Sequence, residues 1–67
     1  MDFKLENDYI TLSQLLKACD FIYSGGQAKF FLQEHKVYVN GQPEQRRGKK
    51  LYKGDCIQID EQRIEIR

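Results

Sequence analysis

The residues of this chain that can do chemistry lie between Ser24 and Lys53, and their chemistry is that of holding phosphate groups. A glycine pair opens the segment SGGQAK, where a helix start without side chains would expose its backbone N–H groups to an anion. Five cations and no acid follow between Arg46 and Lys53. Backbone amides and clustered Lys and Arg side chains both hold phosphates in proteins. Nucleic acid is therefore the first class of ligand to consider.

The overall charge conceals this cluster. The net charge of the 67 residues is only +1, but it is −2 over residues 1–28, +5 over residues 29–53 and −2 over residues 54–67. A chain with a near-neutral total can therefore still carry one basic face. The alternative is a solvated loop of long cationic side chains, which explains any one of these residues equally well.

Other chemistries find little support in the sequence. His35 is the one histidine, and its place on an apolar helix stripe favours a packed residue over a general base. Cys19 and Cys56 have no metal-ligand spacing, and we expect them to be buried, free thiols. The acids Asp60 and Glu61 are typical of a solvated turn. We therefore expect a protein without catalytic residues, metal or cofactor.

The length and the absence of apolar runs limit the architecture further. With 67 residues the chain makes one domain, residues 1–67, with a small core. No apolar run approaches the roughly 20 residues that cross a bilayer, and the first eight residues, MDFKLEND, lack the apolar segment of a signal peptide. We expect a cytoplasmic monomer with no membrane partner.

Two short helices are predicted in the first half. Thr11 and Gln14 have the spacing of a capping box. The first apolar stripe consists of Leu12, Leu15, Leu16 and Cys19. After a connection in which Phe21 and Ile22 turn inward, the second stripe consists of Ala28, Phe31, Leu32 and His35, with Lys29, Gln33 and Lys36 on the opposite side. Helices this short must share their apolar faces to be stable.

Short strands are predicted around these helices and through the second half. The apolar alternation indicates strands at residues 9–10, 37–39, 57–59 and 64–66. Asn40-Gly41 suits a tight hairpin turn, and Gly54-Asp55 another. Pro43 limits any return strand to an edge, so residues 42–50 should be mostly loop. The predicted fold is α+β, with two short helices packed on a small, mainly antiparallel sheet.

The order of these motifs resembles the S-four-type RNA-binding domain, whose core is called the alpha-L motif. SGGQAK, VYVNG and the K-G-D turn stand in the family's order and spacing, and the resemblance covers about residues 9–60. The length and SGGQAK point further, to the short stand-alone bacterial members of the YaaA and YbcJ type. The resemblance implies binding of structured RNA, ribosomal or transfer RNA, on its own or in a ribosomal subunit, with a role in ribosome assembly.

The family's motif assigns candidate RNA-binding residues in three groups. At the start of the second helix the candidates are Ser24, Gly25, Gly26, Gln27, Lys29 and Phe30. At its end the candidate is Lys36, which equally well suits the helix dipole. In the basic loop and the turn after it they are Arg46, Arg47, Lys49, Lys50 and Lys53, with Gly48 allowing the loop to bend. Ser24 can cap the helix or donate to a phosphate.

Phe30 is the one departure from the family's pattern, because many members carry Arg or Lys at this position. It lies off the apolar stripe, so its ring could stack on an unpaired base, or pack on Tyr38, Tyr52 or a protein partner. Tyr52 alternates with Leu51 and is ambiguous in the same way, with core or sheet packing favoured. The alternative to RNA binding is therefore a small protein-interaction adaptor with Phe30 and Tyr23 at the contact.

Overall fold

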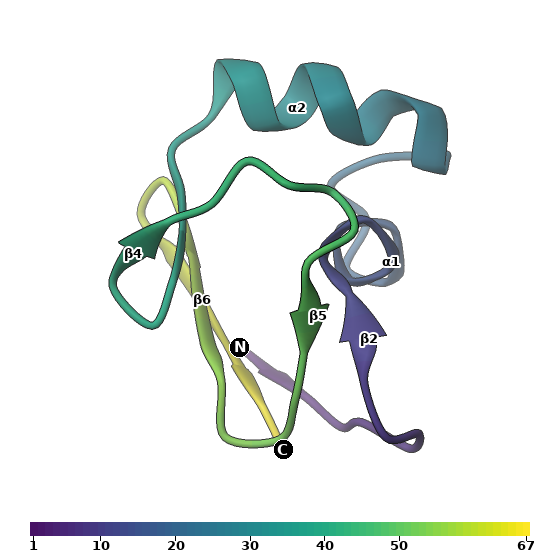
Figure 1. Cartoon of the computed structure of the whole chain (residues 1–67), viewed down its shortest axis with the longest axis vertical. Coiled ribbons are helices and arrows are strands. Elements are labelled where there is room, and N and C mark those ends of the chain that lie inside the picture. Colours follow the sequence, from purple (N-terminus) through teal and green to yellow (C-terminus); the bar gives the residue numbers. More distant parts are fainter.

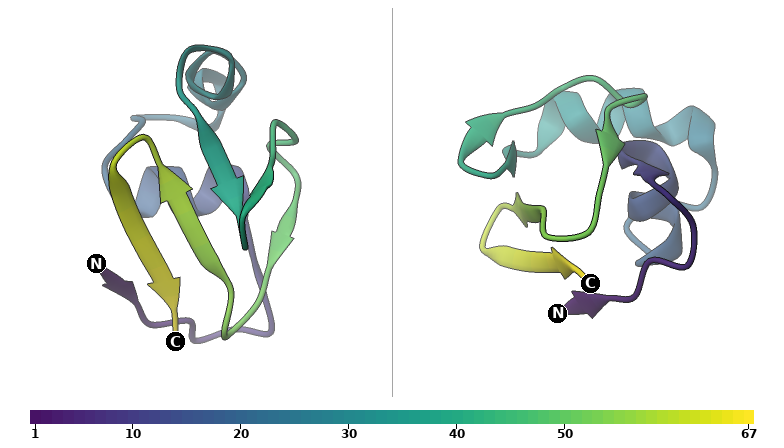
Figure 2. Two further views of the ribbon diagram at one scale, coloured as in Figure 1. Left: turned by 90° about the vertical axis from the view of Figure 1, so that its left-hand side faces the viewer. Right: turned by 60° about the horizontal axis from the view of Figure 1, so that its bottom comes forward.

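Two helices and a five-stranded sheet enclose one apolar core. The computed structural model describes all residues from 1 to 67. In Figure 1, α2 lies across one end of the molecule, and α1 is seen almost end-on below it. Figure 2 shows α1 behind the sheet and α2 above the end of its strands. The core contains 14 buried side chains drawn from both helices and from most strands, so the predicted α+β architecture is confirmed.

Helix α1 spans Leu12–Ala18 and begins at the predicted capping box. The Gln14 N–H donates to Thr11 Oγ1 (3.3 Å), and the Thr11 N–H donates to Gln14 Oε1 (3.0 Å). The stripe is buried at Leu12, Leu15 and Leu16, and Cys19 follows half-buried. Two orphan amides of the first turn are thereby satisfied locally, which fixes where the helix starts.

Helix α2 spans Ala28–Glu34 and continues from a 3₁₀ turn, η1, at Gly25–Gln27. Ala28 and Leu32 are fully buried, and Phe31 packs edge-on against Phe21 with 5.8 Å between ring centroids. Ile22 is buried as well. The inward turn of the connection between the helices is therefore confirmed.

The five-stranded sheet has the order β1-β7-β6-β3-β4. Its strands are β1 (Asp2–Phe3), β3 (Val37–Val39), β4 (Gln42–Pro43), β6 (Cys56–Ile59) and β7 (Gln62–Ile66). All neighbours are antiparallel except β1 and β7, which are parallel. A separate two-stranded ladder joins β2 (Ile10–Thr11) to β5 (Lys50–Leu51). No helix is long and apolar enough to cross a membrane.

Residues 42–50 were expected to be mostly loop, but both ends of this segment belong to strands. Gln42 and Pro43 form the edge strand β4, and Lys50 begins β5. Only the segment between them, residues 44–49, is irregular; we call it the basic loop. Pro43 fits because an edge position does not require its missing N–H.

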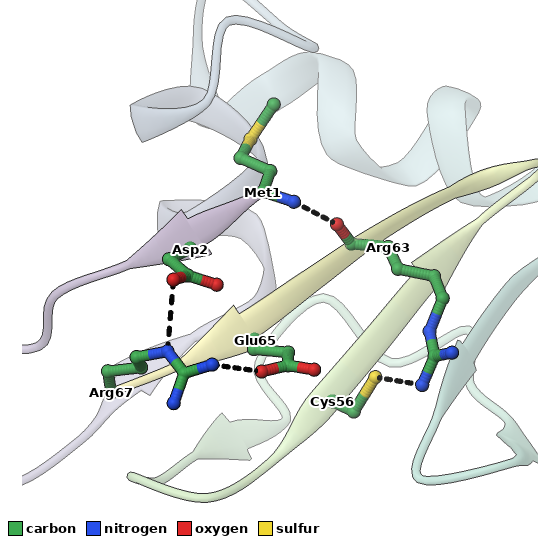
Figure 3. Close-up of polar contacts among 6 residues, drawn as sticks. All are labelled: Met1, Asp2, Cys56, Arg63, Glu65 and Arg67. Carbon is green, nitrogen blue, oxygen red and sulfur yellow. Dashed lines mark hydrogen bonds and ion pairs between the residues drawn. The ribbon is translucent and has the colours of Figure 1, made fainter.

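The strand β1 was not predicted from the sequence, because only two of its residues pair with β7. Figure 3 shows the contacts that hold it: the Met1 ammonium donates to the Arg63 carbonyl (3.0 Å), and the Arg67 guanidinium lies 3.0 Å from Asp2. Arg67 also donates to Glu65 (2.6 Å), and Arg63 donates to Cys56 Sγ (3.4 Å). The two C-terminal arginines are thus used by the fold. Cys56 is a free thiol, like Cys19, and both are half-buried, whereas we expected them buried.

The V-N-G and K-G-D turns are hydrogen-bonded to each other. Asn40, at φ 51°, donates through Nδ2 to Asp55 Oδ1 (3.0 Å) and accepts from the Cys56 N–H (2.8 Å). Asp55 Oδ2 accepts from the Tyr52 N–H (2.8 Å). Two motifs separated in the sequence therefore form one structural unit, which sets the position of β5 beside the β3–β4 hairpin.

Candidate nucleic-acid interface

The basic loop, residues 44–49, runs beside α2 in Figure 1 and in the left view of Figure 2. Its backbone is anchored to the start of α1: the Ser13 N–H donates to the Arg47 carbonyl (2.9 Å) and the Leu12 N–H to the Lys49 carbonyl (2.8 Å). These bonds satisfy two further orphan amides of α1. Because the carbonyl groups are held inward, the loop has a fixed path.

The candidate cations lie on several elements. Lys29 on α2 is exposed, as are Arg46 and Arg47 in the basic loop and Lys50 at the start of β5, and Lys49 of the basic loop is half-buried. Lys36 lies in the connection at the opposite end of α2 from η1. The turn that contains Lys53 lies at the end of the molecule opposite α2 (Figure 1). The structure thus separates Lys53 from the loop that it adjoins in sequence, because β5 runs away from α2.

Arg46 is not a free cation. Its Nε lies 2.9 Å from Glu44 Oε2 and its second guanidinium nitrogen donates to Glu44 Oε1 at 3.0 Å, a two-pronged pair. The Arg46 N–H also donates to Glu44 (3.0 Å). These bonds lower the pKa of Glu44 from 4.5 to about 2. The expectation that Arg46 clamps a phosphate is therefore less favoured than the same role for Arg47.

We predict a pH dependence of stability from this pair. A carboxylate whose pKa is lowered on folding contributes stability above its unfolded pKa and loses it as the pH falls through the folded value. The contribution of Glu44 should be complete above pH 4.5 and disappear as the pH falls toward about 2. In urea unfolding at several pH values, Glu44→Gln should be less stable than the parent at pH 6, with the difference vanishing near pH 2. Glu61→Gln, at an exposed turn position, is the control and should show no such convergence; a constant difference for Glu44→Gln would contradict the pairing.

The glycines at the start of α2 are not required by the fold. A Cβ on Gly25 would meet nothing within 4 Å, and one on Gly26 would come no closer than 3.9 Å to Ser24 Oγ. Neither residue has a positive φ. Their N–H groups donate to no acceptor within the chain. The absence of side chains leaves these two amides open to a ligand.

The polar residues beside these glycines take part in capping. Ser24 is the N-cap residue of η1, with extended backbone. Gln27 folds back, and its Oε1 accepts from the N–H groups of Tyr23 (2.6 Å) and Ser24 (3.1 Å). The expectation that Gln27 contacts RNA applies at most to its amide NH₂, because its oxygen is used by the turn.

Phe30 is 63 % exposed, and its ring stacks on no other ring of the chain. It borders a hollow of about 250 Å³ together with Phe21, Ile22 and Phe31. Of the possibilities left open by the sequence, packing on Tyr38 or Tyr52 is therefore excluded. Stacking on a base and contact with a protein remain.

The motif order and this geometry agree with a comparison to known families. A model of the S4 domain matches residues 3–67. The chain belongs to the S4 domain family. A relative in Bacillus subtilis (strain 168), with the name "Probable ribosome maturation protein RlbA", is 54 % identical over 56 residues, which cover 84 % of this chain and 79 % of the relative.

In this S4 domain His35 has a role that the sequence did not indicate. Its ring is half-exposed and stacks on Phe31 (4.1 Å between centroids), and its Nδ1 lies 2.6 Å from Asp60 Oδ2. Asp60 Oδ1 also accepts from the Lys36 N–H (3.2 Å). These two hydrogen bonds lower the pKa of Asp60. His35 is packed on Phe31 and Asp60 lies in an exposed turn, as expected, and the S4 domain adds a polar link between the end of α2 and the β6–β7 turn.

The S4 domain also exposes two tyrosines, Tyr9 and Tyr52, of which Tyr9 is not among the residues that the sequence indicates. Tyr52 was expected to pack in the core or sheet, but it is 49 % exposed, and Leu51 is the buried neighbour. The Tyr52 ring contacts that of Tyr9, with 6.2 Å between centroids. No local sequence signal relates these residues, since only the β2–β5 ladder brings them together.

Proposed function

We propose that this chain is a non-catalytic module that binds structured RNA, with ribosomal RNA as the first candidate and transfer RNA as the second, and that it acts in ribosome assembly. Membership of the S4 domain family and the name of the Bacillus relative, a probable ribosome maturation protein, support this proposal. The partner is either free RNA or RNA within a ribosomal subunit.

The observation that carries the proposal is the anchored basic loop beside α2. Its carbonyl groups are bonded to the first turn of α1, so its cationic side chains project from a fixed backbone. A preorganised set of cations loses less conformational entropy on binding than the same side chains on a mobile loop. This arrangement suits a rigid, shaped polyanion such as folded RNA.

In the proposed complex most contacts are made to the RNA backbone. Arg47 can hold a phosphate through two parallel hydrogen bonds, while Lys29, Lys49 and Lys50 act as point charges. The open amides of Gly25 and Gly26 add two donors next to Lys29. Recognition of this kind follows the shape of the RNA and selects little by sequence.

A salt titration tests this function. Neutralising three to five phosphates should give a log–log slope of affinity against salt of roughly −2 to −4.5, at about −0.7 per contact on single strands and −0.9 on duplex. The measurement is the dissociation constant for a ribosomal RNA fragment at several potassium chloride concentrations. An affinity that does not change with salt would rule out the proposed RNA binding.

A second candidate is a protein-interaction adaptor, and one observation favours it. Phe30 and Tyr23 are 63 % and 91 % exposed, and Phe30 borders an apolar hollow. Large exposed aromatics are typical anchors of protein interfaces. The same titration separates the two candidates, because an apolar contact with a protein lacks the counterion release that makes RNA binding sensitive to salt.

A further inference from the structure

Figure 1 shows β2 and β5 side by side. Two exposed tyrosines that the proposed function does not use flank the Ile10–Leu51 pair of this ladder. Tyr9 and Tyr52 are 41 % and 49 % exposed, with 6.2 Å between ring centroids and 51° between ring planes. The Lys50 Nζ lies 4.8 Å from the centroid of the Tyr9 ring. Both tyrosines are therefore partly open to solvent, and a cation lies over the Tyr9 ring.

Two hollows meet at Tyr52. One, of about 490 Å³, lies between the β3–β4 hairpin and β5, and the other, of about 420 Å³, lies against the basic loop. Both are lined by Arg46, Lys49, Lys50 and Tyr52. These volumes lie within the roughly 300–1,000 Å³ that is typical of small-ligand sites. There is room beside Tyr52 for a single nucleotide.

The charges around the two tyrosines give them different roles. Tyr9 borders a third hollow that also contains Glu6 and Asp8, where a phosphate would be repelled. Tyr52 shares both of its hollows with cations. Tyr52 is thus the ring that can receive an anionic ligand, and the Tyr9 ring lies next to it.

The two acids that line the larger Tyr52 hollow already have partners within the chain. Glu44 is paired with Arg46, and Asp55 accepts hydrogen bonds from the Tyr52 N–H (2.8 Å) and from Asn40 Nδ2 (3.0 Å). The bond to Asp55 also fixes the backbone that carries the Tyr52 ring. A ring with a fixed backbone and an adjacent ring behind it makes a preorganised stacking surface.

We propose that Tyr52 stacks on one unpaired base of the bound RNA while Lys49 and Lys50 hold the adjacent phosphates. This proposal rests on the proposed function, and it narrows the target to a helix interrupted by an unpaired nucleotide. Stacking on an aromatic ring tolerates any base. The site therefore selects for an unpaired position in the RNA and not for its sequence.

The test compares two RNA stem-loops that differ only at one bulged position, an adenosine in one and an abasic ribose in the other. Both have the same number of phosphates, so their salt-dependent binding is matched. The wild-type protein should bind the adenosine stem-loop about 5- to 150-fold more tightly, the range expected for one stacked base. Tyr52→Leu should lose this preference with an unchanged salt slope, and Tyr52→Phe should keep it. Tyr23→Leu, at another exposed tyrosine, is the matched control and should also keep it.

A direct signal from the unmodified protein supports the comparison. The chain has four tyrosines and no tryptophan, so its tyrosine fluorescence can be followed without interference. It should be quenched more by the adenosine stem-loop than by the abasic one. Equal affinity of the wild-type protein for both RNAs, or loss of the preference in Tyr23→Leu instead of Tyr52→Leu, would overturn this inference and leave RNA binding intact. Failure to bind either RNA in a salt-dependent way would overturn both proposals.

Discussion

Reversing the charges of Lys29 and Arg47 together should abolish RNA binding while leaving the fold intact. Both side chains are exposed, and neither takes part in a hydrogen bond or ion pair within the chain. Each charge-assisted hydrogen bond to a phosphate is worth about 1.5–3 kcal/mol, so the loss of two should weaken binding about 100-fold or more. Two glutamates facing phosphates add repulsion. Gel-shift or fluorescence titration with a ribosomal RNA fragment at about 0.1 M salt measures the effect.

Arg47 is a better partner for this test than Arg46. A glutamate at position 46 would face Glu44, and the lost pairing would itself perturb the loop. The effect of Lys29→Glu with Arg46→Glu would therefore combine altered loop structure with lost RNA contacts. Arg47 contributes to the fold only through its carbonyl, which any residue retains.

The matched control for this variant is Lys4→Glu with Lys17→Glu. It makes the same change in net charge, from +1 to −3. Lys4 follows β1 and Lys17 lies in the last turn of α1; both side chains are exposed, and neither lies in the basic loop or on α2. This variant should retain RNA affinity to within a few-fold. If the Lys29 and Arg47 variant binds as tightly as the control while its circular dichroism is unchanged, the RNA site lies elsewhere.

The parts of the fold that could be predicted from the sequence depend on short-range signals. The capping box joins residues three apart, and the Asn40-Gly41 turn needs only the positive φ values that these two residues tolerate. The apolar stripe of α1 follows from a period of 3.6 residues. Each of these signals is contained in a few consecutive residues, so no knowledge of the tertiary structure is needed to recognise them.

The parts that could not be predicted depend on contacts between distant segments. The basic loop is anchored through its backbone carbonyls, which every residue has, so its docking on α1 leaves no trace in the side chains. The parallel pairing of β1 with β7 also gives no recognisable sequence pattern, because only two residues of β1 take part in it. Sequence proximity also misleads: Lys53 is close to Lys50 in the chain, but β5 takes its turn to the far end of the molecule (Figure 1).

For the candidate site, the sequence predicted which types of residue it contains but not which of them are free to contact a ligand. Arg46 and Arg47 are adjacent residues of the same type, and only the structure shows that Arg46 is paired with Glu44. The place of Gln27 in the motif makes it a candidate RNA-binding residue, but its side-chain oxygen accepts hydrogen bonds within the turn before the helix. Which cation is free depends on the competing partners within the fold. The sequence alone does not contain that information.

Replacing Leu51 by Ala should greatly lower the stability of the fold and should also disturb the site around Tyr52. Leu51 is fully buried in β5, between Lys50 and Tyr52. Removing a buried leucine side chain costs about 2–5 kcal/mol, whereas a domain of this length has a stability of roughly 3–10 kcal/mol. The melting temperature should fall by at least about 8 °C, because 1 kcal/mol corresponds to about 4–8 °C in domains of this size. Thermal unfolding followed by circular dichroism measures it.

The expected loss is large because the strand pairing of β5 is short. Its ladder with β2 contains only the pairs Ile10–Leu51 and Thr11–Lys50, so the burial of Leu51 must add to the hydrogen bond between Tyr52 and Asp55 to keep β5 in place. Leu51→Met conserves the volume and should cost less than about 1.5 kcal/mol. Gln58→Ala, at an exposed position of β6, should change stability by no more than about 0.5 kcal/mol. If Leu51→Ala melts within about 2 °C of the parent, a shift below 1 kcal/mol, then β5 does not pack on the core as described. In that case Lys50 and Tyr52 would not be held in the positions from which we infer base stacking.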